Sequence, residues 1–151
     1  MKIAKILFAA ILLFVFSSCQ PGIQDGASLS INHINYIKSL GLLAADEHII
    51  LFDSQYRIKV SGNFFTDKRI ASYWINERDA KKSTIDYAFY KDVDSMKIVK
   101  KKNIAYLNVH KTDGHTFKVV VKASTLETGY FLGEAMKTWL QFKNSNANHQ
   151  Q

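Results

Sequence analysis

Histidines and paired carboxylates are the side chains in this sequence whose chemistry could serve catalysis or metal binding. The carboxylates fall in expected loops or turns, at positions 46–47, 77, 79, 86, 92 and 94. The histidines are His33, His48, His110, His115 and His149. None stands at metal-ligand spacing from Cys, Asp or Glu, and His110 facing His115 across a turn would make an incomplete site. The sequence also lacks a Gly-x-Ser-x-Gly elbow, a Cys–His pair and a phosphate loop. We therefore predict a non-enzymatic protein with no metal and no cofactor.

Cys19, the single cysteine, follows a segment typical of a secretory leader. Lys2 and Lys5 precede an apolar run over 6–16, which is too short to span a bilayer because spanning needs about 20 residues. The segment Phe16-Ser17-Ser18-Cys19 resembles the bacterial lipobox, in which the cysteine becomes the acylated N-terminus of the mature chain. We therefore predict an exported lipoprotein held in a membrane by several acyl chains on Cys19, palmitate among them. The alternative is an ordinary secreted protein in which Cys19 is incidental.

The residue after the cysteine bears on which membrane holds the protein. Gln20 stands where an aspartate retains some lipoproteins at the inner membrane, so the outer membrane is favoured. The rest of the chain is expected to form one domain between a polar tether and a disordered tail. The expected boundaries are 1–18 for the signal peptide, 19–28 for the lipidated cysteine and tether, 29–143 for the domain, and 144–151 for the tail.

Hydrophobic periodicity predicts a mainly β domain with a helix at each end. Apolar residues spaced by three predict a short helix within 29–43, with Ser30 as its N-cap and its end near Gly41. Ser124 to Glu127 form a capping box that begins a C-terminal helix with a broad apolar stripe. Gly129 and Gly133 in that helix are expected to allow close packing on a sheet. About seven strands are expected in meander order, over 48–52, 56–60, 64–65, 70–75, 84–90 continued at 96–99, 104–109 and 116–121.

Three segments are similar to bacterial families of the pleckstrin-homology (PH) superfold. They are the strand Asp46 to Phe52, the pair Ser61-Gly62, and the run Phe65-Thr66-Asp67-Lys68-Arg69-Ile70 that opens another strand. The resemblance spans about residues 42–143. It implies an α+β, mainly β fold of bent antiparallel sheets or a partly open barrel, capped by the C-terminal helix. Within the third segment we expect Asp67 to accept backbone amides and close a tight turn. PH-like folds host lipid binding, peptide binding and scaffolding, so the fold alone does not give the function.

The net charge of +7 favours anionic partners. Since an exported protein rarely meets nucleic acid, lipid or an envelope polymer is the favoured anion. The resemblance to PH domains implies a phosphate site at the loop between the first two strands. The candidate anion-binding residues there are Arg57 and Lys59, joined by Lys81 and Lys82 from a neighbouring loop. The simpler interpretation is a solvated strand face with charged loops.

Aromatic residues on adjacent strands offer a second candidate surface: Tyr73, Trp74, Tyr87, Phe89 and Tyr90. Strand alternation buries about half of such a set, and an exposed remainder would suggest a protein or glycan surface. We therefore expect a membrane-anchored PH-like module that binds or scaffolds an envelope protein partner. The alternatives are a module for anionic lipid head groups and a soluble secreted binder of a small ligand.

Overall fold

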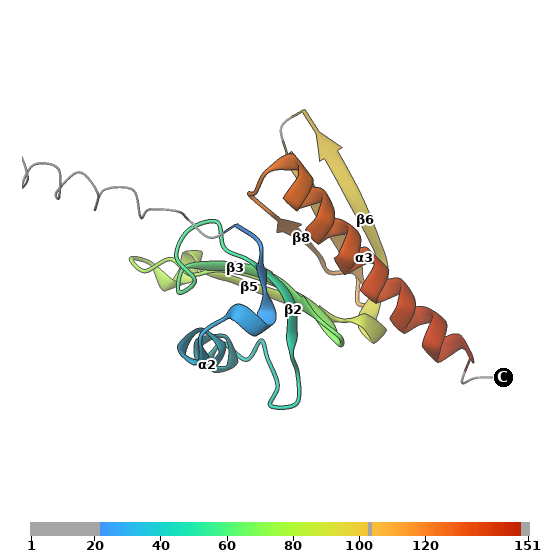
Figure 1. The fold of residues 1–151 in the computed structure, drawn as a ribbon, viewed down its shortest axis with the longest axis horizontal. Helices are drawn as coiled ribbons and strands as arrows, with labels where there is room; N and C mark the ends of the chain where they lie inside the picture. The colour runs from blue at the N-terminus through green and yellow to red at the C-terminus, as the bar shows by residue number, and fades with distance from the viewer. Residues whose placement is uncertain (1–21, 103, 149–151) are drawn as a thin grey trace, which may run out of the picture.

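Two antiparallel sheets and two helices make up residues 22–102 and 104–148, the part of the chain described by the computed structural model (Figure 1). Cys19 and the leader lie outside these residues. Sheet A has the order β1–β2–β3–β4–β5 and sheet B the order β6–β7–β8. The strands are β1 (Gln24–Asp25), β2 (Ile49–Asp53), β3 (Ser61–Thr66), β4 (Arg69–Trp74), β5 (Thr84–Phe89), β6 (Val93–Lys101), β7 (Ile104–Lys111) and β8 (Thr116–Val120). The helices are α2 (Ile31–Ser39) and α3 (Thr125–Asn148), with 3-10 turns η1 (Gly26–Ser28), η2 (Ala80–Lys82) and η3 (Tyr90–Asp92).

This arrangement confirms the expected fold class, with eight strands in the described residues and sheets that do not close into a barrel. Figure 1 shows α3 lying across sheet B and α2 on the opposite side of sheet A. Both helices begin as expected, because Ser30 accepts the amide of His33 and Ser124 accepts the amide of Glu127. Within the described residues, no helix combines the length and hydrophobicity that crossing a bilayer requires.

The main core fills the space between the two sheets and α3. Phe65 on β3 meets Phe131 on α3 edge to face, with ring centroids 5.3 Å apart. Leu107 on β7 and Leu132 on α3 are almost fully buried in the same cluster. Burying such side chains stabilises the fold by about 1.5–3 kcal/mol each, so this cluster fixes α3 on the sheets.

A second core lies on the outer face of sheet A, where α2 covers β2 and β3. Ile37 of α2 is fully buried and belongs to one cluster with Phe52, Phe64 and Tyr73. The hydroxyl of Tyr36 donates to the carbonyl of Lys59 at 2.7 Å, which ties the helix to the loop after β2. Sheet A is therefore buried on both faces at β2 and β3.

The segment expected to be a tether is part of the domain from Gln24 onward. Gln24 pairs with Phe52 and Asp25 with Leu51, so β1 extends sheet A, and η1 follows it directly. Gly26 is buried so tightly that an ideal Cβ there would lie 1.8 Å from the carbonyl oxygen of Ile49. The tether predicted over 19–28 is therefore wrong for residues 24–28, because backbone pairing with β2 makes the polar residues Gln24 and Asp25 part of the sheet.

Two further expectations about elements are wrong. Residues 56–60 form a turn rather than a strand, with the amide of Val60 donating to the carbonyl of Arg57 at 2.7 Å. Helix α3 continues to Asn148, so the expected disordered tail is helical over 144–148. The polar pattern was misleading in both places. Apolar and polar residues can alternate in a turn by chance, as over 56–60, and polar residues can extend a helix that is already nucleated, as over 144–148.

The turn between β3 and β4 is closed by Thr66 and not by Asp67. The Thr66 hydroxyl accepts the amides of Lys68 and Arg69, each at 3.0 Å. It also donates to the Glu47 carboxylate at 2.8 Å, so one hydroxyl joins the turn to the segment before β2. Asp67 is exposed and takes no part in this network.

Arg69 and Glu47 form a buried ion pair beside that turn. The Arg69 Nε donates to Oε1 of Glu47 at 2.8 Å and its Nη2 donates to Oε2 at 2.6 Å. Burial by itself raises the pKa of the Glu47 carboxyl, but hydrogen bonds from Arg69, the Ala44 amide and Thr66 hold that pKa below its ordinary value. The Arg69 guanidinium also lies 4.2 Å from the centre of the Phe89 ring, so the pair supports β5.

We predict that Gly26→Ala destabilises the fold, because its methyl group would collide with the Ile49 carbonyl. The expected loss is about 1–3 kcal/mol in the free energy of unfolding, measured by urea denaturation. Gly133→Ala is the matched control, because a Cβ at Gly133 meets nothing within 4 Å and alanine favours the helix. Equal stability of Gly26→Ala and the parent chain would mean that residues 24–28 are not part of the packed domain.

We predict that Arg69→Met costs about 3–5 kcal/mol of stability, since it leaves the Glu47 carboxylate buried without its countercharge. The double variant Glu47→Gln/Arg69→Met is expected to recover part of this loss, because it removes both charges. Urea denaturation of the two single variants and the double variant measures the coupling. Simple addition of the two single losses would show that the pair does not act as a unit.

Candidate functional site

Strand β5 is the free edge of sheet A. It pairs with β4 alone among the described strands. The amide of Tyr90 donates to the carbonyl of Lys68, so Tyr90 and Lys68 form a hydrogen-bonded pair. From Tyr90 back toward Thr84, the residue pairs between β5 and β4 are alternately non-hydrogen-bonded and hydrogen-bonded. The backbone groups of Phe89, Tyr87 and Ile85 consequently point away from β4. They offer unpaired donors and acceptors of the kind that accept an additional strand.

The same three residues form an exposed apolar row on the outer face of sheet A. Register places Phe89 beside Arg69 and Tyr87 beside Ala71. The side chain of Tyr87 remains 41% exposed, and its ring meets that of Phe89 edge to face at 5.8 Å. The row is therefore ordered but open on one side.

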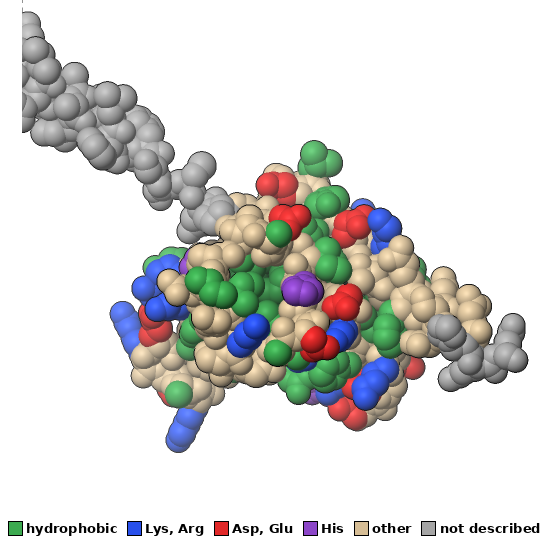
Figure 2. Space-filling model, turned by 60° about the horizontal axis from the view of Figure 1, so that its bottom comes forward, with side chains coloured by type: hydrophobic (Ala, Val, Ile, Leu, Met, Phe, Trp, Pro, Cys, Tyr) green, Lys and Arg blue, Asp and Glu red, His purple; other side chains and the backbone are tan. Residues whose placement is uncertain are grey.

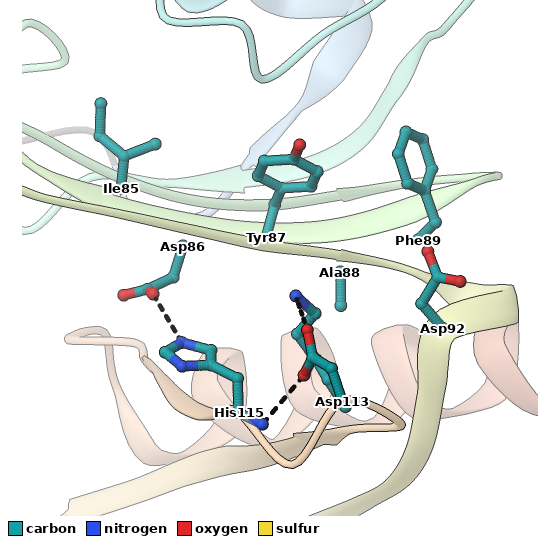
Figure 3. A pocket seen from close by; sticks show the side chains of 9 residues that line it. Ile85, Asp86, Tyr87, Ala88, Phe89, Asp92, Asp113 and His115 are labelled. Carbon is teal, nitrogen blue, oxygen red and sulfur yellow. Dashed lines mark hydrogen bonds and ion pairs between the residues drawn. The ribbon is translucent and has the colours of Figure 1, made fainter.

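A cleft of about 610 Å³ lies between β5 and the turn that joins β7 to β8. Figure 3 shows Ile85, Tyr87 and Phe89 pointing to one side of β5, while Asp86 and Ala88 point to the other, toward that turn. The lining residues are Ile85, Asp86, Tyr87, Ala88, Phe89, Asp92, Lys111, Asp113 and His115. Backbone edge, apolar row and cleft thus meet along a single strand.

Carboxylates dominate the charge of the cleft. His115 Nε2 lies 3.2 Å from Asp86 and bridges the two sides (Figure 3). The His115 amide and the Lys111 ammonium group hold the pKa of Asp113 below its usual range. Three acidic side chains line the cleft with one lysine and one histidine, and Asp113 pairs with Lys111 at 3.0 Å as Asp86 does with His115. None of the described lining residues is Ser, Thr or Cys.

The four residues predicted to bind an anion lie on two loops at one end of sheet A. Arg57 and Lys59 follow β2, whereas Lys81 and Lys82 lie in η2 between β4 and β5. The loops are joined because Arg57 Nη2 binds Glu77 at 2.5 Å. Within the second loop, Lys82 pairs with Asp79 at 3.3 Å. Figure 2 shows acidic side chains among the basic ones at this left end. Two of the four cations are thus committed to carboxylates, which favours the interpretation as charged loops.

The remaining sequence candidates separate into core and surface. Tyr73 and Tyr90 are buried, Phe89 is half-buried, and Trp74 and Tyr87 are exposed. In the described residues, no three His, Cys, Asp or Glu side chains gather closely enough to hold a metal ion.

His110 contacts Thr116 and Asn108 rather than His115. Sequence reasoning missed that Asp86 and His115 share a cleft. Asp86 lies on β5 of sheet A, and His115 lies 29 positions later in the turn before β8 of sheet B. The alternating sequence of β5 indicated the apolar row on that strand but not the cleft.

Comparisons with known proteins give the fold and no family. No family model and no curated protein matches the sequence. The structure is similar to the crystal structure of a DUF1696 family protein with a pleckstrin-homology domain from Shewanella loihica PV-4. The TM-score is 0.51 at 17% sequence identity, over 80% of this chain and 97% of that chain. At that identity the likeness shows the fold alone, and the chain accordingly has a PH-like fold.

Proposed function

We propose that this chain is a membrane-anchored, non-enzymatic binding module that takes up an extended segment of a partner protein along β5. The observation that carries the proposal is the edge of β5, with Ile85 and Tyr87 exposed and Phe89 half-buried beside it. An added strand would satisfy the outward backbone groups of β5 and gain affinity from main-chain hydrogen bonds. The PH-like fold supports a binding role, since this fold commonly serves recognition.

The two faces of β5 define the chemistry of the segment. Side chains of an added strand alternate between the two faces of the sheet. One set would lie beside Tyr87 and Phe89 and should be apolar. The other would point into the cleft toward Asp86, Asp92 and Asp113 and should be basic. The partner segment is thus an extended strand of alternating apolar and basic residues.

We predict that peptides selected from a random displayed library on the purified full chain follow this alternating pattern. Tyr87→Pro should weaken a selected peptide at least about tenfold in fluorescence polarisation, because it removes an outward amide without breaking a bond to β4. Tyr87→Ala should weaken it less, since only the side-chain contact is lost.

Tyr56→Ala is the matched control, because Tyr56 is also an exposed tyrosine and lies on the loop after β2. Loss of binding in Tyr56→Ala, or undiminished binding in Tyr87→Pro, would place the peptide site elsewhere.

The anchoring half of the proposal is supported by the leader and by the position of Cys19 directly after it. We predict that the chain purified from the membranes of a bacterial host has the mass of residues 19–151 plus acyl chains. A mass without acyl chains would reduce the proposal to a secreted binding module and would leave the β5 site unaffected.

A further inference from the structure

The described chain begins against the first turn of α3. An ideal Cβ on Gly22 would lie 2.8 Å from Glu127 Oε1, and Ile23 packs against the main core. Cys19 precedes Gly22 by three residues, which span at most about 11 Å when extended. An acylated Cys19 would therefore hold this end of the molecule at the bilayer surface.

Large apolar side chains stand exposed at the same end. Leu126 and Tyr130 lie one turn apart on one face of α3, with 85% and 57% of their surface exposed. Gly129 and Gly133 open onto solvent as well, because a Cβ at either position meets nothing within 4 Å. The expectation that these glycines pack on the sheet is therefore wrong.

The tip of the β6–β7 hairpin adds a further apolar residue. Ile104 is 51% exposed and lies two residues before Tyr106, which pairs with Val120 at the end of β8 just before α3. Figure 1 shows the tip of β6 and the start of α3 at the same upper end of the molecule. Figure 2 shows hydrophobic side chains at the upper edge, with acidic side chains beside them.

Lysines surround these apolar residues. Lys100, Lys101 and Lys102 form the hairpin tip, and Lys122 precedes α3; all four are exposed. None of them takes part in an ion pair with another described residue. Glu127, the carboxylate nearest to Lys122 in the chain, accepts the backbone amide of Ser124 in the capping box. The lysines are consequently free to meet anionic head groups.

We propose that this end of the molecule, the anchor-proximal face, rests on an anionic bilayer surface with Leu126 and Tyr130 inserted among the head groups. The face consists of Ile104, Leu126 and Tyr130 with Lys100, Lys101, Lys102 and Lys122. The proposal rests on the acyl anchor at Cys19. Basic residues around exposed leucine and tyrosine are the composition that binds membrane interfaces.

This orientation also determines how far the cleft beside β5 lies from the membrane. Strand β7 runs from Ile104 in the anchor-proximal face to Lys111 in the cleft. Eight strand residues span roughly 25 Å. The cleft would therefore be held away from the lipid, where it can receive a partner from the aqueous side.

The test uses the full chain purified from bacterial membranes and reconstituted in vesicles of phosphatidylcholine with one quarter phosphatidylglycerol. An environment-sensitive fluorophore is attached to Leu126→Cys, a substitution at an exposed site. Ile31→Cys on α2 is the control, because Ile31 is also an exposed apolar residue and lies on the other side of sheet A.

We expect blue-shifted emission and quenching by spin-labelled lipid at position 126 and neither at position 31. Replacing Lys100, Lys101 and Lys122 with glutamine should reduce the quenching at least twofold. Omitting phosphatidylglycerol should do the same.

Three results would overturn the inference, each in a distinguishable way. Equal emission and quenching at positions 126 and 31 would remove the proposed orientation while leaving the anchor and the β5 site intact. Self-quenching at position 126 that depends on protein density, without quenching by lipid, would assign the face to a second copy of the chain. Fluorophore incorporation into the parent chain would reveal a free Cys19 thiol and remove the anchor itself.

Discussion

The ion pair between Arg69 and Glu47 is the contact on which three parts of this fold converge. Its acceptor lies before β2, its donor begins β4, and Thr66 joins both through the turn of β3 and β4. It alone among the ion pairs of the described residues is buried on both sides. Because Arg69 also lies under the rings of Phe89 and Tyr87, it orders these rings from beneath while their other sides stay open. The pair thus couples the stability of the domain to the shape of the proposed binding edge.

The outer face of sheet A is covered at some strands and open at others. The N-terminal addition of β1, η1 and α2 buries the outer face at β2 and β3, and the free edge at β5 keeps its outer face uncovered. On the inner face a polar row of Asp53, Asn63, Ser72 and Asp86 crosses the strands in register. Asn63 donates to the carbonyl of Val120 and Asp86 meets His115, so polar contacts rather than apolar packing join the sheets beside the cleft. A cleft can persist there because its rim is held by directional bonds.

The sequence was a good guide to elements and a poor guide to the site. Periodicity and caps located both helices, because Ser30 and Ser124 act within one turn of chain. The strands at Thr84–Phe89 and Thr116–Val120 were visible for the same local reason. What failed depends on distant partners: β1 exists only because β2 offers an edge to Gln24, and Thr66 closes its turn while also bonding Glu47. The cleft joins Asp86 to His115 across two sheets, and no local pattern records that approach.

The length of the β6–β7 hairpin links the two proposed surfaces. These strands have nine and eight residues, whereas those of sheet A have at most six. The hairpin contributes Leu107 and Val109 to the core, and its tip carries the exposed Ile104. A hairpin built for the core alone would gain little from an apolar residue at its tip, since 51% of the surface of Ile104 stays exposed there. The presence of Ile104 beside lysines that form no ion pair with a described residue is explained if the hairpin contacts lipid at its tip and holds the cleft at its other end.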